Sequence, residues 1–161
     1  MKSIKTIKGA IAIVDDEDYE RVLTQNWFFD GRYIVANPWN KTTKKQDHIY
    51  LHRFILDTPK GMVTDHINNN PLDNRKSNLR TCSWSENARN RTKPKINKSH
   101  TKTSSIYKGV CFEIDRNKWT ATIKINGKTK SLGYFDDEIK CAQKYDEYAK
   151  LHYGEFAKTN F

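Results

Sequence analysis

A basic tract with few apolar residues divides the chain of 161 residues and limits what it can fold into. Every charged residue from Arg89 to Ser105 is Lys or Arg, and little in the tract could build a core. Such a segment favours a solvated linker that can lie along phosphates. We therefore expect two small domains, 1–91 and 105–161, joined by a basic linker over 92–104.

Net charge indicates a polyanionic partner. The chain has 29 Lys plus Arg against 19 Asp plus Glu, a net charge of +10 and a pI near 9.5. This balance favours nucleic acid, although an anionic membrane or simple solvation also fits it. No apolar run approaches a membrane span, and no signal peptide is evident. Cys82, Cys111 and Cys141 are too scattered for a thiolate zinc site or a disulfide framework, so we expect a soluble intracellular protein with free thiols.

The first part of the chain predicts a small α+β lead-in. A strand over 9–14 precedes a helix with an acidic start at Asp15, whose apolar positions continue at helical spacing to Trp27. The runs 33–36 and 48–56 are predicted to be paired strands.

An Asn-rich loop then separates a short apolar entry from a predicted helix. Asp65 and His66 begin the loop, which extends to Asn78. Ser83 and Glu86 have capping-box spacing, so a helix is expected to begin there and to continue to residue 91. The predicted order over 62–91 is strand, loop, short strand, helix.

The residue types in this segment suit phosphodiester hydrolysis. His66 could deprotonate water, while Asp65 and Asn87 could offer oxygen ligands to a hard divalent cation. Asp-His pairs and Asn-rich turns are common, so the spacing is more informative: Asn78 follows His66 by twelve residues and Asn87 follows Asn78 by nine.

The segment from Val63 to Arg80, followed by Ser85-Glu-Asn87, resembles the HNH homing endonucleases of phages and bacteria. The resemblance implies a ββα-metal core within 48–91, with His66 as general base, Asp65 and Asn87 as metal ligands and Asn78 as the residue that braces the loop. An Asn at the last position argues against a zinc-type site. The implied ion is Mg²⁺, with Mn²⁺ as a possible substitute.

Other polar residues near this segment are harder to place. His52, inside the predicted strand 48–56, is more typical of a hydrogen-bonded structural residue that supports the site than of a ligand. Asn74 and Asn90 are expected at a turn and on the helix surface. Arg89 and Arg91 could bind phosphate, with a solvated face as the default.

The C-terminal part predicts a three-stranded antiparallel sheet packed on one helix. Strands are expected over 107–113, 119–125 and 129–134, with Asn126-Gly127 as a hairpin turn. The helix is expected to be capped by Asp136 and to end at Gly154. Its apolar face would comprise Ile139, Ala142, Tyr145, Ala149 and His152.

Strand alternation predicts which sheet face is exposed. Trp119, Ala121, Ile123 and Ile125 would face the helix, which leaves Thr120, Thr122 and Lys124 outward.

Residues 105–161 resemble the plant APETALA or ethylene-response-factor DNA-binding domain, which reads the major groove with its sheet. The aromatic, glycine and hairpin positions match in order. The resemblance places Lys108, Arg116, Thr129 and Ser131 near DNA. Several plant arginines are replaced here, by Cys111 among others, so the plant recognition sequence is not carried over.

Together these features predict an α+β protein: a lead-in with an HNH core, then the sheet-and-helix domain. Its expected function is metal-dependent, homing-type cleavage of double-stranded DNA in a bacterial or phage-infected cell. A monomer that nicks one strand is the favoured form. The alternatives are a DNA-binding regulator with a relic HNH frame and, on charge alone, an RNA-binding protein.

Overall fold

The computed structural model describes residues 1–94 and 103–161. It contains two compact units, an N-terminal unit over Met1–Asn87 and a C-terminal unit over Ala88–Phe161. Of the linker expected at 92–104, residues 95–102 lie outside the described part of the chain.

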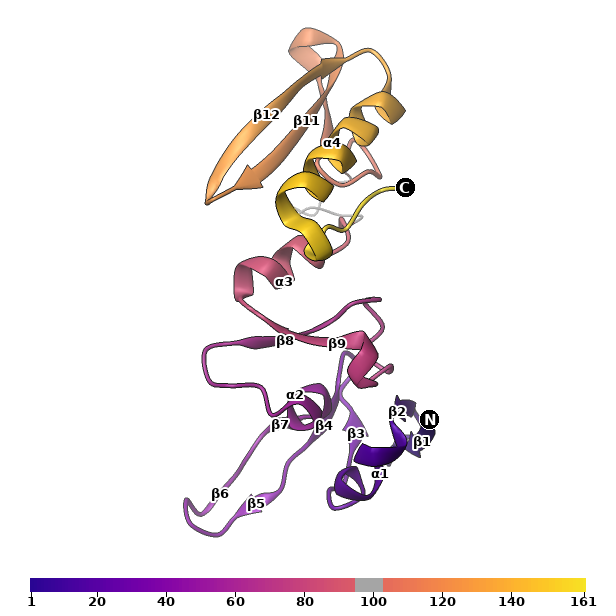
Figure 1. The fold of residues 1–161 in the computed structure, drawn as a ribbon, viewed down its shortest axis with the longest axis vertical. Coiled ribbons are helices and arrows are strands. Elements are labelled where there is room, and N and C mark those ends of the chain that lie inside the picture. The colour runs from indigo at the N-terminus through magenta and orange to yellow at the C-terminus, as the bar shows by residue number, and fades with distance from the viewer. Residues whose placement is uncertain (95–102) are drawn as a thin grey trace. The chain divides into compact units, whose positions relative to one another are not determined.

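The N-terminal unit combines short strands with two short helices and the start of a third, α3, which continues past the boundary at Asn87 (Figure 1). Its elements in chain order are β1 (Lys2–Lys5), β2 (Ile11–Val14), α1 (Asp16–Val22), β3 (Phe28–Phe29), β4 (Ile34–Ala36), β5 (Trp39–Asn40), β6 (Lys45–Gln46), β7 (Ile49–Tyr50), α2 (Leu51–Leu56), β8 (Val63–His66), η1 (Lys76–Asn78), β9 (Leu79–Cys82) and α3 (Trp84–Asn90). The strands form two-stranded sheets β1-β2, β5-β6 and β8-β9, and a three-stranded sheet in the order β3-β4-β7.

One apolar cluster holds this unit together. Its buried members are Ile4, Ala12, Val14, Val22, Trp27, Ile34, Ala36, Leu51, Ile55 and Leu79. These residues come from segments that lie before, within and after the β3-β4-β7 sheet in the sequence. Leu79 packs on the same core and thereby brings the β8-β9 hairpin against it. The hairpin that carries Asp65 and His66 is thus anchored on packed side chains rather than on a loop.

Two lead-in predictions are wrong. The segment 48–56 is not one strand: β7 ends at Tyr50 and α2 begins at Leu51. Leu51 and Ile55, one helical turn apart, fill the core, and this spacing decides the element. The first helix stops at Val22 instead of reaching Trp27, because the chain turns back and the Trp27 indole donates to the Val22 carbonyl at 2.7 Å.

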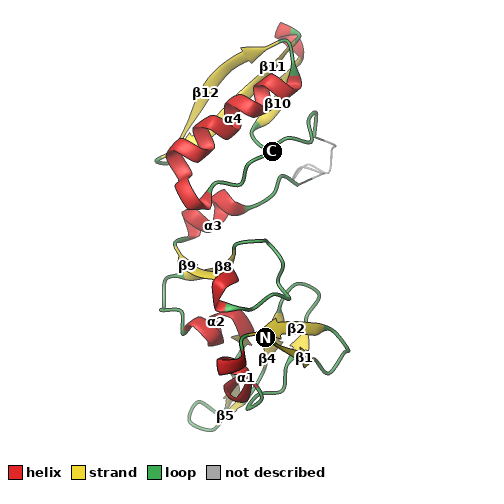
Figure 2. Cartoon of the chain, turned by 45° about the vertical axis from the view of Figure 1, so that its right-hand side comes forward, coloured by secondary structure: helices red, strands yellow, loops and turns green. Residues whose placement is uncertain are grey.

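The C-terminal unit has a three-stranded antiparallel sheet with a long helix packed across it (Figure 2). Its elements are β10 (Val110–Glu113), η2 (Ile114–Arg116), β11 (Lys118–Ile125), β12 (Lys128–Phe135), α4 (Glu138–Tyr153) and η3 (Gly154–Phe156). Asn126 and Gly127 both have positive φ and join β11 to β12, as the sequence predicts for this hairpin.

Helix α4 ends at Gly154 as predicted, but its N-cap and part of its packed face differ from the prediction. Asp137, not Asp136, is the N-cap, and its side chain accepts from the Lys140 N–H at 2.7 Å. Ile139 is 49% exposed and His152 is exposed as well, so neither belongs to the packed face. Cys141, Ala142, Tyr145, Ala149 and Tyr153 form that face. Of the predicted face, Ala142, Tyr145 and Ala149 are buried as expected, and Cys141 and Tyr153 are buried in place of Ile139 and His152.

The last residues of the chain are tied to the middle of α4. The Asp146 carboxylate is 5% exposed and accepts from the backbone N–H groups of Asn160 and Phe161 and from the Asn160 side-chain amide. Asn160 also accepts from the Lys108 N–H, which links the start of β10 to the same point. A buried carboxylate with this many donors is a strong local tie.

Candidate active site

The candidate site lies on the β8-β9 hairpin and the start of α3. In the hairpin, Asp65 is paired with Arg80 and His66 with Leu79. The Ser83 hydroxyl accepts from the Glu86 N–H at 3.2 Å, and the Glu86 carboxylate accepts from the Ser83 N–H at 2.8 Å. This reciprocal capping fixes where α3 begins, and the order strand, loop, strand, helix matches the prediction for 62–91.

The Asn-rich loop is closed by hydrogen bonds from Asn78. The Asn78 side-chain oxygen accepts from the Asn68 N–H at 3.0 Å, and its amide donates to the Asp73 carbonyl at 2.8 Å. The loop is also bound to β2, where the Asn74 N–H donates to the Ile13 carbonyl. The loop that follows His66 therefore has a defined shape.

His66 is buried, 6% exposed, and its ring is oriented by Asn74. His66 Nε2 lies 3.3 Å from Asn74 Oδ1, and the Asn74 amide donates to the Pro71 carbonyl. That second bond fixes the amide orientation, so Nε2 carries the proton and Nδ1 is the basic nitrogen of the neutral ring. Burial lowers the pKa of His66, and the bond to Asn74 acts in the opposite direction.

Sequence reasoning did not find the Asn74 contact. Asn74 was expected only at a turn, and in a loop with several asparagines nothing in the pattern singles it out. Its side chain is 1% exposed, and burial of a polar side chain is the signal that only the structure supplies.

Asp65 forms a buried ion pair with Arg80, which the sequence prediction also missed. The Arg80 Nε and Nη2 atoms lie 3.0 and 2.8 Å from Asp65 Oδ2, and both side chains are largely buried. Only the strand pairing in the structure shows that these two residues lie opposite each other. Arg80 offsets the Asp65 charge and holds the carboxylate in place.

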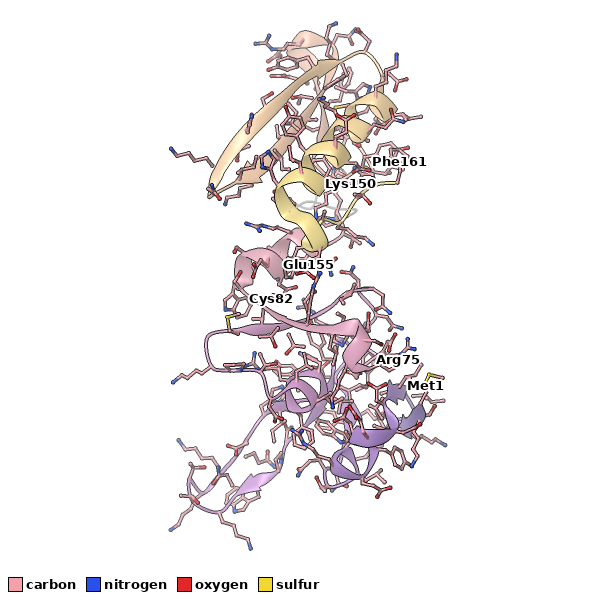
Figure 3. All side chains as sticks on the ribbon, viewed as in Figure 1. Met1, Arg75, Cys82, Lys150, Glu155 and Phe161 are labelled. Atoms are coloured by element: carbon pink, nitrogen blue, oxygen red, sulfur yellow. The ribbon has the colours of Figure 1, made fainter. Side chains whose placement is uncertain are left out.

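Cys82, the last residue of β9, carries a buried thiol (Figure 3). Burial and then the charge of Asp65 raise the pKa of this thiol to about 11, while the Asn87 backbone N–H acts to lower it. Cys82 is thus a neutral packing residue, while the two residues expected to be metal ligands lie on different elements, Asp65 on β8 and Asn87 on α3.

His52 lies next to His66, on α2 rather than on a strand. The two imidazole centroids are 5.0 Å apart, and the Tyr33 and Tyr50 rings lie 5.1 and 5.5 Å from His52. Burial, together with the neighbouring His66 and Arg53, lowers the pKa of His52 to about 3. His52 is therefore a neutral packing partner of His66 at ordinary pH.

Neutral burial of His52 should make the N-terminal unit acid-sensitive. Unfolded His52 binds a proton below about pH 6.5, whereas folded His52 does so only near pH 3, so the unfolding free energy falls as pH drops through this window. Between pH 6.5 and 4.5 the wild type should lose about 2–3 kcal/mol more than His52→Gln in urea titrations. The exposed His152→Gln is the control, and equal losses in His52→Gln and wild type would contradict the assignment.

Tyr33 and Arg32 form a further layer that the sequence did not indicate. The Tyr33 ring is stacked on His66 at 6.3 Å, and the Arg32 guanidinium lies 5.0 Å from the Tyr33 centroid on exposed surface. The turn before β4 therefore brings a positive charge close to the candidate base.

The donor atoms favour a hard cation. In the described part of the chain no group of three or more His, Cys, Asp or Glu is arranged to hold a metal ion. Asp65 and Asn87 supply only oxygen, a donor set that suits Mg²⁺, which keeps water and phosphate ligands. Among the same residues no helix is long and apolar enough to cross a membrane.

The residues expected to contact DNA in the C-terminal unit are only partly on its surface. Thr129, Ser131 and Lys124 are exposed, and Thr122 is half-buried. Thr120 is 8% exposed, which corrects the prediction, because β11 is the central strand and Cys111 and Tyr134 flank Thr120 on either side.

Basic residues near this sheet differ in what they contact. Arg116 is exposed, and its guanidinium lies 4.7 Å from the Tyr134 ring centroid. The Lys108 ammonium donates to the Arg89 carbonyl, and burial lowers the pKa of Lys108 to about 8. The Arg89 guanidinium lies over the Tyr153 ring, so Lys108 and Arg89 are engaged within the unit, whereas Arg91 is exposed.

Comparison with known proteins shows which family the chain belongs to. An uncharacterised HNH endonuclease of Acanthamoeba polyphaga mimivirus is 31% identical over 156 residues, which cover 95% of this chain and 76% of that protein. The chain belongs to the HNH endonuclease family. The HNH endonuclease family model matches residues 57–89, which include Asp65, His66, Asn78 and Asn87. Protein 3.8 of Escherichia phage T7 is 35% identical over 100 residues, 62% of this HNH chain and 77% of that protein.

Proposed function

We propose that this HNH protein is a homing-type, metal-dependent endonuclease that hydrolyses phosphodiester bonds in double-stranded DNA. The observation that carries the proposal is the buried, neutral His66, whose Nε2 is bound by Asn74 and which follows Asp65 on β8 of the hairpin that leads into α3 and Asn87. A base, its orienting partner and two oxygen ligands are the groups that hydrolysis of a phosphodiester requires.

His66 acts as the general base through Nδ1. Asn74 holds the Nε2 proton, so the ring presents its lone pair on the other side and can accept a proton from water. Tyr33 and His52 pack on the ring and limit its rotation, and Asn78 holds the loop that follows. These neighbours are positioning residues, because they act through His66.

Asp65 and Asn87 would hold one Mg²⁺ or Mn²⁺ ion. When bound, such an ion offsets negative charge on the phosphate and on the leaving 3′ oxygen. Arg80 keeps the Asp65 carboxylate at a fixed position, and the exposed Arg32 can attract the phosphate near His66. A single site of this kind cuts one strand, so a monomer should nick.

We assign target recognition to the C-terminal unit, which resembles the ethylene-response-factor domain. Its outer face combines hydroxyl groups from Thr122, Thr129 and Ser131 with the charges of Lys124 and Arg116. Hydroxyl and basic side chains on a sheet can meet both base edges and phosphates. The basic segment after α3 would add contacts to the phosphate backbone.

Cleavage of a supercoiled plasmid library tests the proposal. With EDTA the protein should still bind DNA, but its cleavage rate should be at least about 100-fold lower than the rate with Mg²⁺ or Mn²⁺. Adding either ion should restore cleavage. Sequencing the ends reports the site and the strand. Metal-independent cleavage would remove the metal roles, and binding without cleavage at any metal concentration would favour a DNA-binding protein with a relic HNH frame.

A further inference from the structure

The β5-β6 hairpin extends away from the rest of the N-terminal unit (Figure 1). Its two strands pair only with each other, with Trp39 opposite Gln46 and Asn40 opposite Lys45. Every residue from Lys41 to His48 is exposed, and none belongs to the apolar core. This part of the hairpin therefore does not contribute to the apolar core of the unit.

Local hydrogen bonds nevertheless give the hairpin a fixed shape. The Asn40 side-chain oxygen accepts from the N–H groups of Thr42 and Thr43, and its amide donates to Asp47 at 2.9 Å. Lys44 adopts a positive φ of 53° that completes the turn. A chain segment held in this way loses little further entropy when it binds a partner.

The exposed side chains of the hairpin suit a polyanion that also offers a flat surface on which an aromatic ring can pack. Lys41, Lys44 and Lys45 are exposed, and within the described residues none of them forms an ion pair. The Asp47 carboxylate is already bound by Asn40. Trp39 is 61% exposed at the base of β5, next to these charges.

A row of rings joins the base of the hairpin to the candidate base. His48 is bound to Asn37 at 2.8 Å, and its ring lies 4.8 Å from that of Tyr50. Tyr50 lies 5.5 Å from His52, which in turn lies 5.0 Å from His66. The hairpin therefore has a defined position relative to His66.

We propose that the β5-β6 hairpin is a DNA-contacting arm that binds the duplex beside the scissile phosphate. The three lysines neutralise phosphates, and Trp39 packs on the sugar and base edges of the same groove. The ring row and the length of the hairpin place these contacts within about one helical turn, roughly 34 Å, of the scissile phosphate. The inference rests on the proposed cleavage of DNA and adds a binding surface to it.

Binding of a labelled duplex in EDTA, measured over a series of KCl concentrations, tests the arm in the full-length protein. The variant carrying Lys41→Gln, Lys44→Gln and Lys45→Gln should reduce the slope of log affinity against log salt by about 2–3, since each phosphate contact contributes about 0.9. Trp39→Ala should weaken binding roughly five- to tenfold without changing the slope. The variant with Lys5→Gln, Lys8→Gln and Lys60→Gln loses the same charge from exposed positions and should change the slope by less than about 1.

Hydroxyl-radical footprints locate the contact. The triple variant of the arm should lose protection on one flank of the cut while it still nicks DNA at saturating protein. If the arm and control variants gave equal slopes and footprints, the proposal for the hairpin would be overturned. Cleavage by the wild type would then still support the proposed function. Failure of the wild type to bind duplex DNA would overturn both. A change confined to sedimentation behaviour would assign the hairpin to self-association and overturn its role on DNA.

Discussion

His66→Ala should reduce DNA cleavage by at least about 1,000-fold and leave DNA affinity within twofold of the wild type. Asn74 holds the imidazole in an orientation that lets it accept a proton, and alanine retains the backbone pairing of β8 with β9. Single-turnover cleavage at saturating protein separates this loss from any change in binding.

A matched histidine supplies the control for this measurement. His152 is exposed on α4 and contacts only the Tyr148 ring among the ring contacts of the described residues. His152→Ala should therefore cleave like the wild type. If His66→Ala also cleaved normally, the general base would have to be another residue and the assignment of His66 would fail.

Gly109→Ala should destabilise the C-terminal unit by roughly 3–5 kcal/mol. Gly109 has a φ of 76°, which L-residues rarely adopt, and a Cβ at this position would overlap the Tyr145 ring. Tyr145 is 3% exposed in the core between α4 and the sheet, so its ring cannot move aside without opening that core. Because small domains have about 5–15 kcal/mol of stability, a large part of the margin would be lost.

Gly127→Ala is the control within the same unit. Gly127 also has a positive φ, of 79°, but a Cβ there would meet no atom within 4 Å. Its cost should be only the conformational part, about 1–2 kcal/mol. Hydrogen exchange of the α4 amides in the full-length protein localises the effect. If the two variants showed equal protection, overlap with the Tyr145 ring would not be the reason that position 109 requires glycine.

Local signals in the sequence were sufficient where one residue type decides the geometry. The Ser83-Glu86 capping box and the Asn126-Gly127 turn occur as predicted, because each is formed by neighbours in the chain. The segment 48–56 failed as a strand because its apolar run fits either period, and only packing of Leu51 and Ile55 on the core selects a helix.

The candidate site shows the same division. Asp65, His66, Asn78 and Asn87 were proposed from residue type, spacing and the resemblance to HNH endonucleases. Asn74, Arg80 and Tyr33 could not, because each acts through a partner that only strand register or loop packing brings near. Residues that orient a site leave less trace in one sequence than residues that perform its chemistry.

The tie between Asp146 and the end of the chain affects the order in which the protein can fold during synthesis. Asn160 and Phe161 donate the hydrogen bonds that the described residues make to the buried Asp146 carboxylate. We therefore expect the C-terminal unit to reach its full stability only after these residues have left the ribosome. The N-terminal unit, whose residues end at Asn87, can be folded well before then, so a nascent chain would hold a formed nuclease hairpin before its second unit is complete.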